Sequence, residues 1–390
     1  MRVCLISVEI FAWGKHGGFG KATRLIGREL VNRGIEVFAV VPRRGHQQPV
    51  EILDGITVLS FNRFKPWEAA GLLRQCDADI YHSQEPSFAT FLARRVMPDR
   101  KHVVTSRDPR ELKDWVIELL HPSLNRLQVF ANYLYEDNPL VRRAVRRADR
   151  VFCAAEFLQA KATRKYRLRR HPEPLPTPVV IPSDLAKSER PTVCYLARWD
   201  RRKRPELFLE LARQFPQVRF IAVGRSRDAE FERRLRATYA HLPNLEMPGY
   251  LDPFDSRGLS SILSPSWIMV NTALREGLPN AFLEAGAHGC AILSGVDPDG
   301  FTSRFGVVVQ DDDFASGLAR LIEDERWREC GERARAHVRA KFQLESVLDR
   351  HLAIYQEMLN GKEPTCPSPI SAANTPEHAW TKPPLAQTRS

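Results

Sequence analysis

Two glutamates, Glu276 and Glu284, flank a short turn in the segment "REGLPNAFLEAGAHGC" (275–290). The turn between them contains Gly277, Leu278, Pro279 and Asn280. Proline suits the start of a helix, and the N–H groups at such a start attract phosphate. Carboxylates accept hydrogen bonds from vicinal hydroxyls, and the helical residues up to Glu284 span roughly 7 Å. The spacing therefore suits a nucleotide diphosphate sugar, with its phosphates at the turn.

A simpler interpretation of the same pair stays open at this point. Glu276 would complement the dipole of the following helix, and Glu284 would be an ordinary surface residue of that helix. The choice depends on whether other residues join the pair to form a site.

A glycine-rich loop, "KHGGFG" (15–20), follows the first apolar run and precedes a helical stretch. Gly17 and Gly18 allow a ligand to approach the backbone closely, and Lys15 adds a positive charge. A dinucleotide fingerprint fits less well, because Thr23 stands where a third glycine or alanine is needed. Arg43 and Arg44 keep an NADP site open as an alternative.

Two cations follow the first strand of the second half, in "YLARWDRRKRPE" (195–206). Arg198 and Lys203 are predicted to clamp a diphosphate, the first through its planar fork and the second as a point charge. The neighbouring cations Arg201, Arg202 and Arg204 equally suggest a basic solvated loop.

Two acidic clusters, at 297–299 and 311–313, contain the Asp-x-Asp pattern of some metal sites. We predict a turn for the first and a helix cap for the second, and no metal site. No histidines have the spacing of metal ligands, and no activated nucleophile is apparent.

The elements that must position these residues form a repeating pattern of apolar strands and helices. Continuous apolar runs alternating with helical stretches predict parallel sheets covered on both faces. The rhythm restarts after a proline-rich linker at 171–184. We therefore predict two doubly wound domains, at 1–175 and 176–345, facing across a cleft. A closing helix at 346–360 is predicted to pack back on the first domain, and 361–390 to be a disordered, proline-rich tail.

The charge is uneven, since residues 1–182 hold 30 Lys and Arg against 19 Asp and Glu, while the rest is balanced. Part of this excess forms a predicted helical stripe that would face an anionic membrane, made of Arg142, Arg143, Arg146, Arg147 and Arg150. Aromatic residues for stacking nucleic acid are scarce, so we expect no nucleic-acid partner. Seven scattered cysteines and no long apolar run predict a cytoplasmic protein, peripheral on the inner membrane face.

Together these motifs resemble those of the retaining glycosyltransferases of family 4, which have the GT-B fold. The similarity runs from residue 1 to about 360 and rests on "KHGGFG", "ARWDRRKRPE", "EGLPNAFLEA" and "PGYL". The Lys-x-Gly-Gly form of the loop, with Glu9 ahead of it, is also similar to the bacterial glycogen synthases. The resemblance implies metal-independent transfer of a hexose from a nucleotide diphosphate sugar, without a further cofactor and with retention of configuration.

The resemblance also implies roles for individual residues. Glu276 would bind the donor sugar and steady positive charge at its anomeric carbon, and Glu284 would hold the ribose. Arg198 and Lys203 would neutralise the leaving diphosphate. The remaining donor contacts would come from Lys15, Gly17, Gly18 and the backbone of Gly277, Leu278, Pro279 and Asn280.

The chain departs from the family pattern in "VVTSRDPRE" (103–111), where Arg107 replaces a histidine and Asp108 is retained. Both are predicted as catalytic residues, although an arginine cannot act as a base. This departure leaves the sugar and the acceptor open. A GT-B epimerase or phosphorylase, and a non-catalytic nucleotide-sugar-binding or scaffold protein, remain alternative functions.

Overall fold

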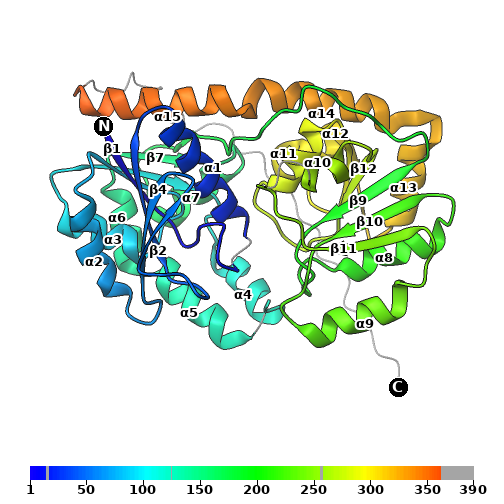
Figure 1. The fold of residues 1–390 in the computed structure, drawn as a ribbon, viewed down its shortest axis with the longest axis horizontal. Helices are drawn as coiled ribbons and strands as arrows, with labels where there is room; N and C mark the ends of the chain where they lie inside the picture. The colour runs from blue at the N-terminus through cyan, green and yellow to red at the C-terminus, as the bar shows by residue number, and fades with distance from the viewer. Residues whose placement is uncertain (15–16, 124, 255–257, 362–390) are drawn as a thin grey trace.

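Two parallel sheets, one in each half of the chain, form the framework of the molecule (Figure 1). The computed structural model describes residues 1–14, 17–123, 125–254 and 258–361. The predicted α/β architecture of two doubly wound domains is confirmed. Lys15 and nearly all of the predicted tail (361–390) lie outside the described residues.

The first domain contains a sheet in the order β3-β4-β2-β1-β5-β6-β7-β8. Its strands are β1 (Arg2–Ile6), β2 (Glu36–Pro42), β3 (Val50–Leu53), β4 (Ile56–Phe61), β5 (Ile80–Ser83), β6 (Lys101–Ser106), β7 (Arg150–Cys153) and β8 (Glu173–Pro174). Its helices are α1 (Gly18–Asn32), α2 (Ala69–Cys76), α3 (Phe88–Val96), α4 (Leu112–Leu120), α5 (Arg126–Glu136), α6 (Pro139–Arg146) and α7 (Leu158–Tyr166), with a 3₁₀ turn at Pro66–Glu68.

The second domain contains a sheet in the order β11-β10-β9-β12-β13-β14. Its strands are β9 (Thr192–Leu196), β10 (Arg219–Val223), β11 (Leu245–Gly249), β12 (Ile268–Asn271), β13 (Ala291–Ser294) and β14 (Gly306–Val308). Its helices are α8 (Pro205–Gln214), α9 (Ala229–Tyr239), α10 (Gly258–Leu263), α11 (Asn280–Ala287), α12 (Phe301–Phe305), α13 (Phe314–Ile322) and α14 (Arg326–Phe342), with 3₁₀ turns at Pro298–Gly300 and Glu323–Glu325.

The central strands of each sheet are largely apolar and buried because helices cover both faces of the sheet. In β1 and β13, for example, every residue from Val3 to Ile6 and from Ala291 to Ser294 is fully buried. Separate hydrophobic clusters lie on the two faces of each sheet. Burial of this kind is the main stabilising contribution in each domain.

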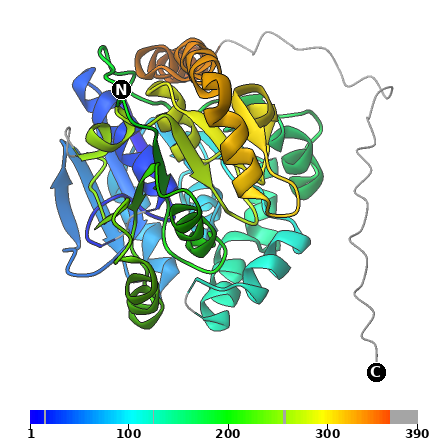
Figure 2. The ribbon, with the colours of Figure 1, turned by 90° about the vertical axis from the view of Figure 1, so that its right-hand side faces the viewer.

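The last helix, α15 (Leu344–Leu359), crosses from the second domain back to the first. Leu348 and Tyr355 are fully buried in the cluster formed by β1, α1 and β2. Helices α14 and α15 run along one side of the molecule, one over each domain (Figure 1, Figure 2). The chain thus ties the two domains together at a second point besides the linker.

Three details differ from the sequence-based expectations. An additional strand, β3, pairs with β4 in antiparallel orientation at the sheet edge. The predicted linker at 171–184 contributes β8, which pairs with β7. The predicted single stripe of five arginines is wrong, because α6 ends at Arg146 and Arg150 lies in β7, paired with Glu173 at 3.2 Å.

Each sheet has one point where the strand order reverses, between β1 and β5 in the first domain and between β9 and β12 in the second. Ligands of open α/β sheets bind outside the carboxyl ends of strands at such points. The loops that follow these four strands contain Gly17, Glu85, Lys203 and Glu276. Gly17, Lys203 and Glu276 are predicted site residues, and the topology directs them to one place.

Candidate active site

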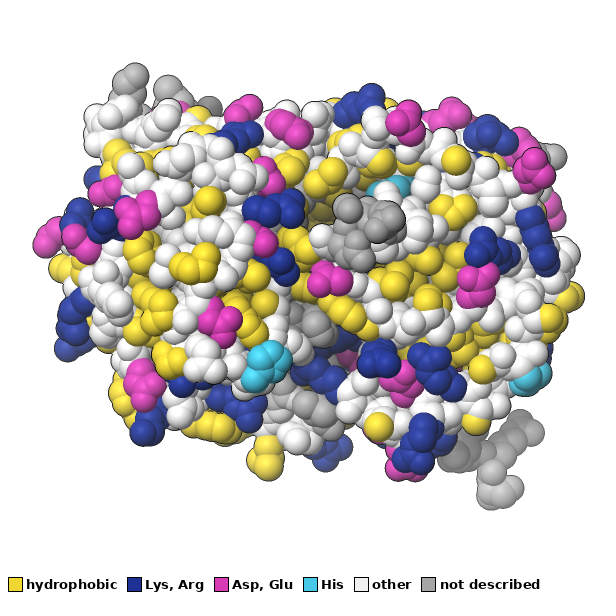
Figure 3. Space-filling view, in the orientation of Figure 1, with side chains coloured by type: hydrophobic (Ala, Val, Ile, Leu, Met, Phe, Trp, Pro, Cys, Tyr) yellow, Lys and Arg dark blue, Asp and Glu magenta, His cyan; other side chains and the backbone are white. Residues whose placement is uncertain are grey.

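The carboxyl ends of both sheets face a hollow between the two domains. Figure 3 shows this hollow, with Lys and Arg side chains gathered at its lower end. Contacts cross it from loops far apart in the chain, such as the 2.9 Å hydrogen bond from Asn280 Nδ2 to the Gly18 carbonyl. Residues predicted from separate motifs thus meet in one cleft.

Glu276 pairs with Lys203, and the two residues lie in the loops that follow β12 and β9. Lys203 Nζ donates to Glu276 Oε1, and Asn271 Nδ2 donates to the same oxygen at 3.2 Å. Both charged side chains are largely buried. The two residues predicted to contact the donor sugar and its diphosphate therefore lie next to each other.

The backbone of Lys203 is held at several points. Its carbonyl accepts from Tyr195 Oη at 2.9 Å and from Thr272 Oγ1 at 2.5 Å, and its N–H donates to Asp200. Asp200 also pairs with Arg198 at 3.6 Å. The Asp200 carboxylate therefore contacts both residues that are predicted to bind the diphosphate.

The other cations of this loop have separate tasks. Arg202 reaches the first domain, where it pairs with Glu118 at 2.8 Å and donates to Ser123 at 2.6 Å. Arg204 donates to the Thr272 carbonyl at 2.8 Å and pairs with Asp312 at 2.6 Å. The loop is therefore not simply a basic solvated segment.

Positive charge from both domains accumulates around Arg227, in the loop after β10. Burial lowers the pKa of Arg227, and the charges of Arg198 and Arg44 lower it further, while Glu9 and Asp200 act in the opposite direction. Arginines whose charges repel each other are stabilised by an anion that binds between them. The electrostatics of the cleft suit a phosphorylated ligand.

Glu284 lies in α11 and binds a lysine of the opposite domain. Lys21 Nζ, from the first turns of α1, donates to Glu284 Oε1, and both side chains are largely buried. Sequence reasoning missed Lys21. A signal was present, because a lysine near a helix start opposes the helix dipole and needs a compensating reason.

Gly17 has no room for a side chain. A Cβ atom there would overlap the carboxylate of Glu9, whose Oε1 accepts from the Gly20 N–H at 3.1 Å. Glu9 thus holds the N-terminal turn of α1, next to Gly18, which contacts Asn280. The glycine permits the close packing of a carboxylate under this turn.

We expect Gly17→Ala to displace Glu9 and to weaken donor binding about tenfold, with a stability loss of about 1–3 kcal/mol from overpacking. Gly71→Ala is the matched control, since a Cβ there meets nothing within 4 Å in a helix. Urea unfolding and donor-induced thermal shifts check both effects. Equal behaviour of the two variants would contradict this account of Gly17.

Arg107 and Asp108 lie directly against the donor-site turn. A Cβ on Gly277 would come within 3.1 Å of the Arg107 carbonyl. The Arg107 guanidinium, however, is buried in the first domain, where it donates to Thr177 at 2.5 Å and to Gln84 at 2.6 Å. Burial lowers its pKa to about 10. Direct contact of this guanidinium with a ligand stays a prediction.

Asp108 belongs to a buried ion-pair network between the domains. Its carboxylate binds the Arg275 guanidinium in a two-point contact, with one bond at 3.0 Å. Arg275 Nε also donates to Asp114 at 2.7 Å. Burial alone would raise the pKa of Asp108, but Arg275 and Arg110 outweigh burial and hold that pKa below its usual value.

Glu85 is a buried carboxyl group under the same loop. Its Oε2 accepts from the backbone N–H groups of Arg107 at 2.6 Å and of Asp108 at 3.2 Å. Burial raises its pKa to about 7. The carboxyl group thus shapes the loop that faces Gly277.

The raised pKa of Glu85 predicts a pH-dependent stability. The folded state retains this proton up to about pH 7 while the unfolded state loses it near pH 4.5, so stability falls as pH rises between these values. We expect Glu85→Gln to remove up to about 3 kcal/mol of this fall. Urea unfolding from pH 5 to 8 measures it, with Glu246→Gln as control. Parallel pH profiles for Glu85→Gln and the wild type would refute the prediction.

The two acidic clusters form the predicted turn and the predicted helix cap. Asp313 caps α13 by accepting from Ser316 N at 3.0 Å. Asp297 accepts from Ser303 N at 3.0 Å, and Asp299 accepts from Phe157 N at 2.6 Å. Across the described ranges, no group of three or more His, Cys, Asp and Glu side chains is arranged to hold a metal ion.

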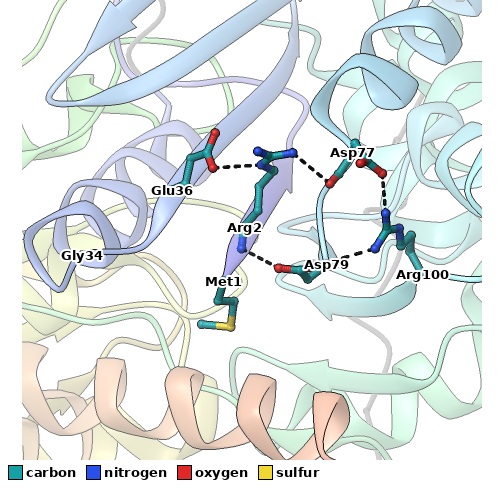
Figure 4. Close-up of a pocket in the computed structure, with 7 residues that line it drawn as sticks. All are labelled: Met1, Arg2, Gly34, Glu36, Asp77, Asp79 and Arg100. Carbon is teal, nitrogen blue, oxygen red and sulfur yellow. Dashed lines mark hydrogen bonds and ion pairs between the residues drawn. The ribbon is translucent and has the colours of Figure 1, made fainter.

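A second hollow lies at the amino ends of the strands of the first sheet, beside the start of β1 (Figure 4). Its charged groups pair with each other: Arg2 with Glu36 at 2.9 Å, and Arg100 with Asp77 at 2.5 Å. It is remote from the strand ends that carry the site residues, and we assign it no part in donor binding.

Comparison with known proteins gives family-model matches in both halves of the chain. A model described as Glycosyltransferase Family 4 matches residues 16–180, and one described as Glycosyl transferases group 1 matches residues 190–324. No curated protein sequence matches the chain.

Solved structures resemble the chain over nearly its whole length. Sucrose-phosphate synthase from Thermosynechococcus elongatus aligns with a TM-score of 0.71 and 18% identity, covering 93% of this chain and 100% of that one. HepE of Anabaena, in complex with UDP-glucose, aligns with a TM-score of 0.66 and 13% identity, covering 93% of this chain and 100% of that one. The catalytic domain of starch synthase IV from Arabidopsis thaliana, bound to ADP and acarbose, aligns with a TM-score of 0.60 and 13% identity, covering 92% of this chain and 99% of that one. At these identities the likeness is one of fold. With both family models, it makes the chain a glycosyltransferase of the GT-B type.

Proposed function

We propose that the chain is a retaining glycosyltransferase of family 4, which transfers a hexose from a nucleotide diphosphate sugar without a metal ion. One observation carries the proposal: Glu276 and Glu284 bracket the 277–280 turn inside the cleft, and each is held by a lysine. A surface role for these glutamates would leave them exposed, whereas both are largely buried. The donor complex of HepE with UDP-glucose, in the same fold, is consistent with this donor class.

The Lys203–Glu276 pair complements such a donor in both of its parts. The diphosphate accepts hydrogen bonds, so it binds the Lys203 ammonium, and the sugar hydroxyls donate hydrogen bonds, so they bind the Glu276 carboxylate. Arg198, fixed through Asp200, adds a second cation for the diphosphate. Glu284 holds the ribose hydroxyls at the other end, in place of its contact with Lys21.

In the proposed reaction the bond between the anomeric carbon and the diphosphate breaks, and its electron pair leaves with the diphosphate. Lys203 and Arg198 stabilise this departing charge, and Glu276 faces the positive charge that develops on the sugar. The acceptor hydroxyl attacks from the side of the leaving group and gives its proton to the departing phosphate oxygen. This order retains the anomeric configuration and requires no enzyme nucleophile.

A donor screen tests the proposal. The protein is incubated with UDP-, GDP- and ADP-sugars, and donor binding is followed by thermal shift and donor cleavage by nucleotide release. We expect one nucleotide to stand out, cleavage to persist in EDTA, and NMR to show the released sugar first in the configuration of the donor. Lack of cleavage of every donor would oppose transfer, loss in EDTA would oppose metal independence, and an inverted product would oppose retention.

A further inference from the structure

Helix α4 presents apolar side chains to solvent. Leu112 is 74% exposed, Val116 46%, Leu119 42% and Leu120 62%. Their spacing of four, three and one residues places them on one face of the helix. A surface helix of a globular protein normally buries such a stripe.

The opposite face of α4 is charged and buried, so the helix cannot rotate to hide its leucines. Asp114 pairs with Arg275 and with Lys161, the latter at 2.5 Å, and Glu118 pairs with Arg202 at 2.8 Å. Turning these carboxylates outward would leave buried arginines unpaired, at a large cost. The ion pairs between the domains therefore fix the orientation of α4 and keep its apolar face in solvent.

Helix α5 continues this face. Leu127 is 81% exposed, Phe130 58% and Leu134 52%, at positions i, i+3 and i+7 of one stripe. Asn125 fixes the start of the helix by accepting from Gln128 N at 2.9 Å, and α4 and α5 pack against each other. The two stripes together are hereafter the α4–α5 face; exposed apolar patches on globular proteins mark interaction sites.

On α4 and α5 the exposed charged side chains are basic, and the acidic side chains face the protein interior. The exposed charged residues of α4 and α5 are Lys113 and Arg126, whereas their acids, Asp114, Glu118 and Glu136, pair with cations underneath. The adjoining helix α6 and its cap expose Arg143, Arg146 and Arg147. Figure 3 shows hydrophobic and basic side chains together along the lower edge of the first domain, where α4 and α5 lie.

We propose that the α4–α5 face docks the protein on an anionic lipid bilayer. An apolar stripe flanked by cations, with no exposed acid on α4 or α5, matches the acyl and headgroup layers of such a membrane. Within the described part of the chain, no helix is long and apolar enough to cross a bilayer. The proposed attachment is interfacial and reversible, and it needs both the apolar face and the basic rim.

Flotation with vesicles tests the proposal on the full-length chain. We expect binding to phosphatidylcholine vesicles that contain phosphatidylglycerol, little binding to pure phosphatidylcholine, and weakening by salt. Leu127→Asp with Phe130→Asp is expected to lower partitioning at least about tenfold. Arg143→Glu with Arg147→Glu is expected to lower it roughly fivefold per charge lost.

The matched control replaces two equally exposed apolar residues elsewhere, Ile52→Asp with Phe64→Asp. It should bind vesicles like the wild type, and all variants should keep the melting temperature and donor response of the wild type. Equal partitioning of wild type and the Leu127/Phe130 variant would overturn the proposal. So would a wild-type dimer that this variant dissociates without any vesicle binding, because a second copy would then cover the face.

Discussion

Replacing Glu276 with Ala is expected to slow donor cleavage by on the order of 100-fold or more, while the protein remains folded. The variant loses the carboxylate that faces the positive charge developing on the sugar in the proposed reaction. The positive charge develops only in the transition state, so the loss should fall mainly on kcat, with a smaller rise in KM from the lost contact with the sugar hydroxyls. Initial rates of nucleotide release from the preferred donor measure it.

Glu284→Ala provides the contrast within the same motif. Its hydrogen bonds to the ribose are the same in the ground state and the transition state, so KM should rise about tenfold with kcat little changed. Glu246→Ala, an exposed carboxylate paired with Arg219, is the control for loss of a negative charge in the same domain. If Glu276→Ala and Glu284→Ala both cleave the donor like the wild type, neither residue contacts it as proposed.

The sequence predicted the parts of the fold that follow from local patterns. The alternation of apolar runs and helical stretches predicted two parallel sheets, because strands covered on both faces are largely apolar. The meeting of Gly17, Lys203 and Glu276 could also be anticipated, since all three follow strands at a switch point. These inferences need only the order of strands and helices.

Side-chain partners across the cleft could not be predicted in this way. Lys21 and Glu284 are 263 positions apart, and Arg275 and Asp108 are 167 apart. Their pairing depends on how the domains face each other, which no local pattern contains. Helix α4 gave no usable signal for a related reason: its apolar period resembles a core face, and only the interdomain ion pairs turn that face outward.

Arg275→Met is expected to destabilise the protein by about 3–5 kcal/mol, because it leaves buried carboxylates without their shared cation. Arg275 forms two bonds to Asp108 and one to Asp114 across the domain boundary. Urea unfolding measures the loss. Arg219→Met, which breaks a surface pair with Glu246, should cost no more than about 1 kcal/mol.

The same substitution should uncouple the domains. Arg275 belongs to the second domain, next to Glu276, whereas Asp108 and Asp114 belong to the first, so their contact links the two domains beside the cleft. We expect a larger radius of gyration in solution scattering, weaker donor binding and a melting transition that splits in two. Arg275→Lys should rescue these properties only in part, because an ammonium cannot reproduce the two-point contact.

The loss of folding stability at acid pH provides an independent measure of this network. The partner cations outweigh burial and lower the pKa of Asp114 to about 2. Its contribution is complete above the unfolded value near pH 4 and disappears as pH falls toward 2. Arg275→Met should therefore reduce the stability lost over this interval, since the variant lacks part of the favourable interaction at neutral pH. An unchanged loss of stability at acid pH, together with a single melting transition, would show that Arg275 does not hold the two domains together.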